Sequence, residues 1–217
     1  MKLDQYDTWL FDLDGTLVYS LGLVWECMTN AAKAVGGEIT DRKAWNLTIG
    51  TGVEKTLAPW VPADRLNEAI ELYLSEFHKR TEDGVNMHDG VFDLLQKLQT
   101  RKCVMGVVTG KRQYSAEDTL QKKGILSFFD VVIGADTIPF QKPAPQPVQE
   151  ALQRLEKNAE SAVFIGDSEH DITAGRLAGV KTIGVLGGSS TEERLRGAGP
   201  DLVVERIADL VRFFEKK

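Results

Sequence analysis

The residues of this chain best suited to chemistry lie in five short stretches, each at the end of an apolar run or just beyond one. Together they supply four carboxylates, a hydroxyl and an amine. Carboxylates that can hold a hard cation, a hydroxyl donor and a lysine ammonium are the groups needed to move a phosphoryl group. The stretches are Phe11–Leu17, Val108–Lys111, Lys142–Pro143, Gly166–Ser168 and Asp171.

Asp12 and Asp14 follow the apolar run Thr8–Phe11, which predicts a short buried strand. In an extended chain these two residues share a face, with Cα atoms about 6.6 Å apart. Carboxylates this close repel by roughly a few kcal/mol at an effective dielectric constant of about 20, so a cation or a proton must compensate. Mg²⁺ prefers carboxylate oxygens, water and phosphate oxygens, and we predict a magnesium site here. Gly15 lets the chain turn away, and a plain Asp-Gly turn is the alternative.

Thr109 and Gly110 follow a second apolar run, Cys103–Val108, which also predicts a buried strand. A hydroxyl and nearby backbone N–H groups are the donors that a phosphoryl oxygen needs. Taken alone, the pair also fits an ordinary turn after a strand.

Lys142 lies directly before Pro143, in a segment whose prolines direct the chain into a helix beginning near Pro145. A lysine held in this way offers a compact cation to Asp12 and to a phosphate. The alternative is an ordinary solvated lysine.

Asp167 follows the apolar run Ala162–Ile165 and would bind the metal. Asp171 lies one helical turn further on, where it would hold a metal-bound water or Lys142 from behind the metal ligands. Ser168 and Asp171 also form a capping-box pattern, which needs no metal.

With these motifs in this order, the chain resembles the haloacid dehalogenase superfamily over nearly its whole length, and within it the phosphoglycolate-phosphatase-like phosphatases. The resemblance implies that Asp12 is the nucleophile that forms an aspartyl-phosphate and that Asp14 is the general acid/base. It also implies that Thr109 and Lys142 stabilise the phosphoryl oxygens, and that Asp12, Asp14 and Asp167 hold Mg²⁺. The implied activity is hydrolysis of a small soluble phosphomonoester, with 2-phosphoglycolate as the leading candidate.

Three further positions are predicted to contact the substrate on the strength of this resemblance. Lys55 ends a glycine-containing run that resembles the segment by which the caps of these phosphatases meet the substrate, although a solvated lysine is the alternative. Gly110 stands where many relatives have Asn, and Tyr19 stands where relatives commonly have Asp. The roles of Tyr19, Glu169 and His170 stay open.

Short apolar runs alternate with segments of helical periodicity, which predicts an α/β fold with a Rossmann-like, mainly parallel sheet and helices on both faces. Ligands of such sheets bind at the carboxyl ends of the strands, where the motif residues lie. The predicted strands are 8–13, 103–109, 130–134, 162–166, 180–185 and a short one within 200–204, and the predicted helices are 89–101, 113–123, 145–156, 170–178 and 206–215.

One long segment interrupts this alternation, with apolar residues at helical spacing in Leu21–Val35 and Leu66–Phe77. Because about seventy residues exceed an ordinary strand-to-helix connection, we predict an inserted helical cap that closes over the substrate. The alternative is a set of helices that simply covers the sheet. The predicted domains are a catalytic core of 1–17 and 86–217 and a cap of 18–85, with hinges near Val18–Ser20 and Thr81–Val85.

The composition sets outer limits on the function. A net charge of −6 and a pI near 5.2 argue against nucleic acid or an anionic membrane as a partner and leave a small phosphorylated metabolite. The two cysteines, Cys27 and Cys103, predict no disulfide framework, and no signal-peptide or membrane-spanning pattern is present. We therefore predict a cytoplasmic monomer or homodimer.

Other activities fit the same motifs. A β-phosphoglucomutase-like sugar-phosphate mutase shares the core, but such mutases place a histidine early in the cap, and this chain has none between Leu17 and Phe77. A dehalogenase generally lacks the acid at the position of Asp14. A nucleotide or pyrophosphate phosphatase and a non-catalytic phosphate-binding protein also stay open, because a fold does not fix a substrate.

Overall fold

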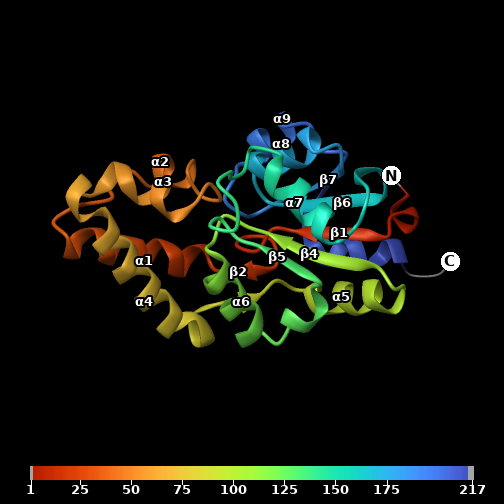
Figure 1. The fold of residues 1–217 in the computed structure, drawn as a ribbon, viewed down its shortest axis with the longest axis horizontal. Helices are drawn as coiled ribbons and strands as arrows, with labels where there is room; N and C mark the ends of the chain where they lie inside the picture. Colours follow the sequence, from red (N-terminus) through yellow and green to blue (C-terminus); the bar gives the residue numbers. More distant parts are fainter. Residues whose placement is uncertain (1, 215–217) are drawn as a thin grey trace.

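The computed structural model describes residues 2–214, and its centre is a six-stranded sheet with the strand order β5-β4-β1-β6-β7-β8 (Figure 1). All paired neighbours in this sheet are parallel, as predicted. The first strand ends earlier than predicted, so Asp12 lies just beyond it. The strands are β1 (Thr8–Phe11), β4 (Val104–Val108), β5 (Val131–Ile133), β6 (Ala162–Gly166), β7 (Lys181–Val185) and β8 (Leu202–Val204).

Helices cover both faces of the sheet, as predicted (Figure 1). Side chains alternate along β1, so Trp9 and Phe11 belong to one apolar cluster and Leu10 to another. The first cluster includes residues of α5 (Val91–Thr100), α6 (Gln113–Lys122) and the 3₁₀ helix η6 (Ile207–Phe214), and the second includes residues of α7 (Gln146–Arg154) and α8 (Glu169–Leu177). The remaining helices of this part are α9 (Glu192–Gly197), which the sequence patterns did not predict, and the short 3₁₀ helices η1 (Leu3–Gln5), η4 (Leu126–Phe128) and η5 (Ala159–Ser161).

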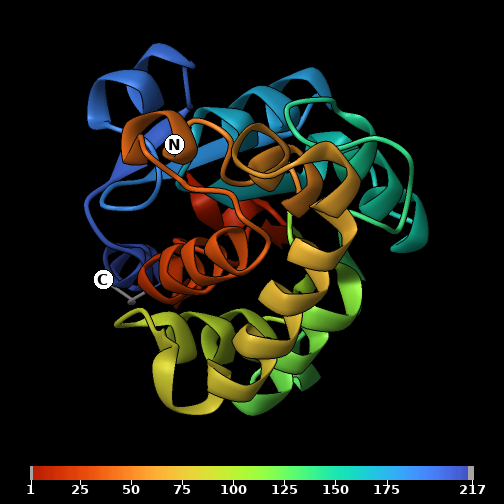
Figure 2. The same cartoon turned by 90° about the vertical axis from the view of Figure 1, so that its left-hand side faces the viewer.

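Residues 21–84, called the cap segment below, are helical as predicted and form the lobe at the left of Figure 1. Two long helices pack against each other there, and Figure 2, which faces this lobe, shows them in front of the sheet. The helices of the cap segment are α1 (Leu21–Ala34), α2 (Arg42–Asn46), α3 (Val53–Leu57), η2 (Ala58–Trp60), η3 (Ala63–Arg65) and α4 (Leu66–Gly84).

The cap segment and the sheet share one apolar cluster, which contains Leu23 and Phe77 from the cap segment together with Trp9 of β1. Where the chain crosses between the two parts, β2 (Val18–Tyr19) pairs antiparallel with β3 (Asn86–Met87). This ribbon ties both crossings together. The division into two domains and the hinge motion stay predictions. None of the helices described within residues 2–214 has the length and apolar character to cross a membrane.

Candidate active site

Three adjacent strands end at the same level of the sheet. β1 lies between β4 and β6 and is in register with both. The residues that follow these strands, Asp12, Thr109 and Asp167, are therefore brought to one edge. All three are buried and line a cavity between this edge and the cap segment.

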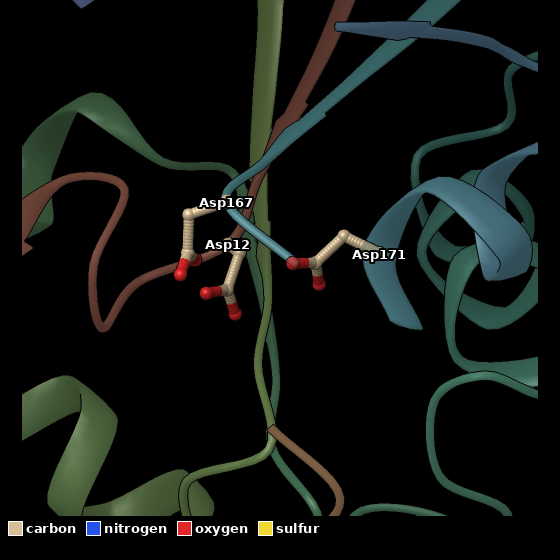
Figure 3. Close-up of side chains that lie close together, drawn as sticks. All are labelled: Asp12, Asp167 and Asp171. Atoms are coloured by element: carbon tan, nitrogen blue, oxygen red, sulfur yellow. The ribbon is translucent and has the colours of Figure 1, made fainter. Parts of the chain in front are cut away.

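A cluster of three carboxylates forms the centre of the site (Figure 3). Asp12, Asp167 and Asp171 are buried, and one carboxylate oxygen from each lies within 4.8 Å of the others. Burial, reinforced by the charge of Asp171, raises the pKa of Asp167 to about 6. Burial also raises the pKa of Asp12 well above its ordinary value. Buried carboxylates that repel one another are a donor set that fits a divalent cation such as Mg²⁺.

The Lys142 ammonium lies between two of these carboxylates. It donates hydrogen bonds to Oδ1 of Asp12 (2.6 Å), Oδ1 of Asp171 (2.5 Å) and the carbonyl of Val108 (3.1 Å). Burial alone lowers the pKa of Lys142, but the charges of Asp12 and Asp171 outweigh it and raise that pKa above its ordinary value. All three N–H donors of the ammonium are therefore engaged, and the side chain lies beside Asp12, where the sequence predicted it.

Asp171 has two partners, and both of its predicted contacts occur together. Its Oδ1 holds Lys142, whereas its Oδ2 accepts hydrogen bonds from the backbone N–H (3.0 Å) and the hydroxyl (2.5 Å) of Ser168. The second set is a capping box at the start of α8. Gly166 permits this approach, because a Cβ there would lie 2.3 Å from Cβ of Asp171.

Asp167 is held by residues that sequence reasoning missed. Its Oδ1 accepts a hydrogen bond from the Thr16 hydroxyl (3.1 Å), and its Oδ2 accepts from the backbone N–H (2.6 Å) and the hydroxyl (2.8 Å) of Ser189. Gly188 leaves room for the carboxylate, since a Cβ there would lie 2.1 Å from Oδ2. The available signal was the run of small residues after β7, at the same edge of the sheet.

Asp14 lies outside the cluster of Asp12, Asp167 and Asp171, and its predicted part in holding the metal stays a prediction. Its Oδ1 accepts a hydrogen bond from the Ser20 hydroxyl (2.5 Å), and its Oδ2 lies 3.0 Å from the Lys111 ammonium. The charge of Asp14 is thus balanced by a lysine. Lys111 was overlooked as a site residue, although it ends the Thr109-Gly110-Lys111 motif.

The cavity has an empty volume of about 600 Å³, counting the space up to its open side. Polar residues of the core form its floor, and the cap segment supplies a mostly apolar wall. The floor includes Asp12, Asp14, Thr109, Lys111 and Asp167, and the wall includes Leu21, Val24, Met28, Ile49, Val53 and Leu74.

Two predicted substrate contacts lie outside this cavity. Lys55 is exposed, because the short helix α3 turns Val53 and Thr56 toward the cavity and leaves Lys55 on another face. Tyr19 is 55% exposed, and its ring centroid lies 3.5 Å from that of His88. The structure gives no support for either residue as a substrate contact.

Gly110 does line the cavity, where it meets the cap segment. A Cβ on Gly110 would lie 2.3 Å from the carbonyl oxygen of Gly50. The absence of a side chain therefore allows the loop before α3 to close directly on the end of β4.

Comparisons with known proteins agree with this geometry. Residues 9–185 match the family model described as "Haloacid dehalogenase-like hydrolase". The chain is 32% identical to the pyrophosphatase PpaX of Anoxybacillus flavithermus, over 94% of this chain and 95% of that protein. It is also 32% identical to the probable phosphatase IndB of Dickeya dadantii, over 93% of this chain and 90% of that protein.

A similar solved structure is that of a "predicted phosphoglycolate phosphatase" from Haemophilus somnus, with a TM-score of 0.87 and 23% identity over 97% of this chain and 99% of that one. This likeness supports the fold, and the family model and the curated relatives support the resemblance inferred from the motifs. The chain belongs to the haloacid dehalogenase-like hydrolases.

Proposed function

We propose that this protein is a phosphatase that hydrolyses a small phosphorylated compound by way of a phosphoryl group carried on Asp12. The observation that carries the proposal is the position of Asp12 at the floor of the cavity, with one carboxylate oxygen held by Lys142. The lysine favours the ionised form of Asp12 and so opposes the effect of burial. An ionised, oriented carboxylate is a nucleophile that divides one difficult displacement into two easier ones.

In the first step an oxygen of Asp12 forms a bond to phosphorus while the bond from phosphorus to the leaving oxygen breaks. Asp14, which faces the same cavity, gives a proton to the leaving oxygen. In the second step a water oxygen attacks the same phosphorus and gives its proton to Asp14. The bond to Asp12 then breaks and inorganic phosphate leaves. The Thr109 hydroxyl is available at the floor of the cavity to donate to a phosphoryl oxygen.

Asp12 and Asp167 are the residues that we propose for holding Mg²⁺. Both carboxylates are buried and close together, and burial raises the pKa of each, so a bound cation would favour their ionised forms. When bound, Mg²⁺ supplies positive charge that neutralises phosphoryl oxygens. Asp171 supports this arrangement by accepting a hydrogen bond from the Lys142 ammonium.

Two substrates lead the list of candidates. The motifs favour 2-phosphoglycolate by their resemblance to phosphoglycolate-phosphatase-like enzymes. Pyrophosphate is the second candidate, because the relative from Anoxybacillus flavithermus is named a pyrophosphatase. Both are small enough for an enclosed site and both carry negative charge beyond the phosphoryl group that is transferred.

The test is phosphate release from a panel of pyrophosphate, 2-phosphoglycolate, nucleoside monophosphates and hexose phosphates, with Mg²⁺ and with a chelator. We expect turnover of at least one compound, lost with the chelator and in Asp12→Asn, which keeps the shape of the side chain but removes its charge. Near-normal turnover by Asp12→Asn would exclude the nucleophile. Isomerised hexose phosphate that appears faster than free phosphate would favour a mutase.

A further inference from the structure

We propose that Lys111 binds the leaving group of the substrate and makes the site selective for phosphates whose leaving group carries negative charge near the scissile bond. The inference rests on the proposed function, because it concerns the same cavity. It assigns to Lys111 a part that differs from that of Lys142, although both are buried lysines of the core.

Lys111 is a buried residue beside the cavity. Its side chain is only 4% exposed, yet it lines the cavity. The ammonium lies 3.0 Å from Oδ2 of Asp14 and 3.9 Å from the ring centroid of Phe77, a residue of the cap segment. The ammonium therefore lies between Asp14, the proposed acid/base, and Phe77 of the cap segment. The Lys111 side chain lines the space where a substrate would lie.

Lys111 and Lys142 differ in how many of their N–H donors are engaged by other residues. A lysine ammonium has three N–H donors. Those of Lys142 are engaged by Asp12, Asp171 and the carbonyl of Val108. Lys111 is different, since among residues 2–214 the acidic group within ion-pair distance of its ammonium is Asp14 alone. Burying an ammonium with spare donors is costly, and a negatively charged oxygen in the cavity would satisfy them.

The partners of the two lysines indicate which part of the substrate each lysine contacts. Asp12 attacks phosphorus, so its partner Lys142 lies on the side of the transferred phosphoryl group. Asp14 exchanges a proton with the leaving oxygen, so its partner Lys111 lies on the leaving-group side. The mostly apolar wall of the cap segment leaves little else there to recognise charge.

Arg112 also lines the cavity, and its buried Nε has no hydrogen-bond partner among the described residues, but its side chain is more exposed than that of Lys111 and no contact joins it to Asp14. Its guanidinium pairs with Glu54 of α3 at 2.5 Å, and its side chain is 36% exposed. Lys55 is exposed and lies outside the cavity. Lys111 is therefore the buried cation best placed for a second phosphoryl group, as in pyrophosphate, or a carboxylate, as in 2-phosphoglycolate.

The test compares kcat/KM for pyrophosphate and 2-phosphoglycolate with kcat/KM for phenyl phosphate, whose leaving group carries no second anion. For each charged substrate the ratio is its kcat/KM divided by kcat/KM for phenyl phosphate. In Lys111→Met we expect this ratio to fall by about 10- to 100-fold, the effect of losing one charge-assisted hydrogen bond. A loss that comes from disturbing Asp14 falls least on pyrophosphate, because its leaving phosphate oxygen is the least basic of the three and needs the least protonation, so such a loss cannot lower the ratio for pyrophosphate. Lys111→Arg should recover part of the ratio because it restores the charge.

A fall of the ratio for pyrophosphate supports the proposal. A fall for 2-phosphoglycolate alone would be explained by weaker protonation of its more basic leaving oxygen and would overturn the proposal. A loss on phenyl phosphate that equals or exceeds the loss on pyrophosphate would mean that Lys111 only positions Asp14, which overturns the proposal. A selective loss in Lys55→Met with none in Lys111→Met would overturn it as well. Lys43→Met, at an exposed position of α2, is the matched control and should change nothing.

Two further readings keep the test decisive. Far-UV circular dichroism checks that Lys111→Met folds. If the variant does not fold, the substrate preference of the wild-type protein still tests the proposal, because a higher kcat/KM for phenyl phosphate than for both charged substrates would overturn it. The proposed function fails separately, if no substrate is turned over or if Asp12→Asn stays active. If Asp12→Asn abolishes turnover but Lys111→Met leaves the ratio unchanged, the proposed function stands and only the role of Lys111 is overturned.

Discussion

At the scale of single residues, two buried lysines separate the environments of two aspartates that lie two positions apart. Lys142 contacts Asp12 and is not among the residues that line the cavity, whereas Lys111 contacts Asp14 and does line it. The proposed nucleophile and the proposed acid/base need different surroundings, and separate partners provide them. The pairing also explains how two carboxylates are tolerated immediately after a buried strand.

Removing the first of these lysines should be costly for both activity and stability. Lys142→Met leaves Asp12 and Asp171 without the cation between them, so we expect turnover to fall by at least about 100-fold. Breaking a buried ion pair from one side should lower the free energy of unfolding by about 3–5 kcal/mol. Saturation kinetics and urea unfolding measure the two effects.

The control for this variant is Lys157→Met, which removes a surface ion pair to Asp7. Such pairs contribute about 0–1 kcal/mol, so this change should have little effect on unfolding. Equal losses in Lys142→Met and Lys157→Met would show that the buried pair has no special importance.

Asp167 should make the metal-free protein less stable as the pH rises. Burial raises its pKa from 3.8 to about 6, so between these values the folded state binds more protons than the unfolded state. The free energy of unfolding should therefore fall from about pH 4 to about pH 6, by about 3 kcal/mol from this group. Asp167→Asn should remove that part of the slope, measured by urea unfolding with a chelator present. Parallel curves for the two proteins would contradict the prediction.

Metal addition should reverse this loss. Above pH 6 the Asp167 carboxylate is charged and buried, so Mg²⁺ should raise Tm more at pH 7 than at pH 5. The expected pattern is a pH-dependent gain in the wild-type protein and little gain in Asp167→Asn. A gain of equal size at both pH values would argue that Mg²⁺ binds elsewhere.

At the scale of elements, the cap segment contacts the core at glycine residues, which allow close approach. Gly50, in the loop before α3, meets Gly110 at the end of β4, and Gly52 leaves room for the side chain of Gln141. Between Gly50 and Gly110 the fit is close because backbone meets backbone, with no flexible side chain that could adjust. The chemistry at the end of β4 is therefore sensitive to where this loop lies.

Gly110→Ala should weaken catalysis without unfolding the protein. The φ angle of Gly110 is outside the left-handed region, so alanine acts through contact with Gly50 and not through backbone strain. We expect kcat/KM to fall by about 10- to 100-fold, because displacement by about 1 Å is enough to disrupt such a site. The control is Gly22→Ala in α1, where a Cβ would meet no atom within 4 Å. Equal activity of the two variants would exclude the role of this contact.

At the scale of the whole molecule, the cap segment and the sheet share an apolar cluster. Leu23 and Phe77 belong to the same cluster as Trp9, and the ribbon of β2 and β3 fixes both chain crossings. The two parts should therefore unfold together.

Thermal unfolding should confirm this coupling. Three of the four tryptophans, Trp25, Trp45 and Trp60, lie in the cap segment, so fluorescence reports mainly on that part. Far-UV circular dichroism reports on both parts. We expect the two midpoints to agree within about 2 °C, as for a single cooperative transition. A fluorescence midpoint several degrees lower would indicate that the cap segment unfolds by itself.

The sequence by itself determined the sheet and the position of its main reactive groups. Apolar runs that alternate with helical periods require parallel strands, and parallel strands of one sheet end at a common edge. Asp12, Thr109 and Asp167 could therefore be placed together without a structure. Lys142 could be added by resemblance to a family that the comparisons then confirmed.

The tertiary structure alone decided which groups touch. The five residues of α3 are too few to fix its orientation by periodicity, so only packing showed that Lys55 faces outward. Strand spacing placed Asp14 on the same side as Asp12, but contacts with Ser20 and Lys111 turned its carboxylate away from the cluster. Hydrogen bonds and ion pairs depend on distances of a few tenths of an ångström between segments far apart in the chain, and local sequence patterns carry no information on such distances.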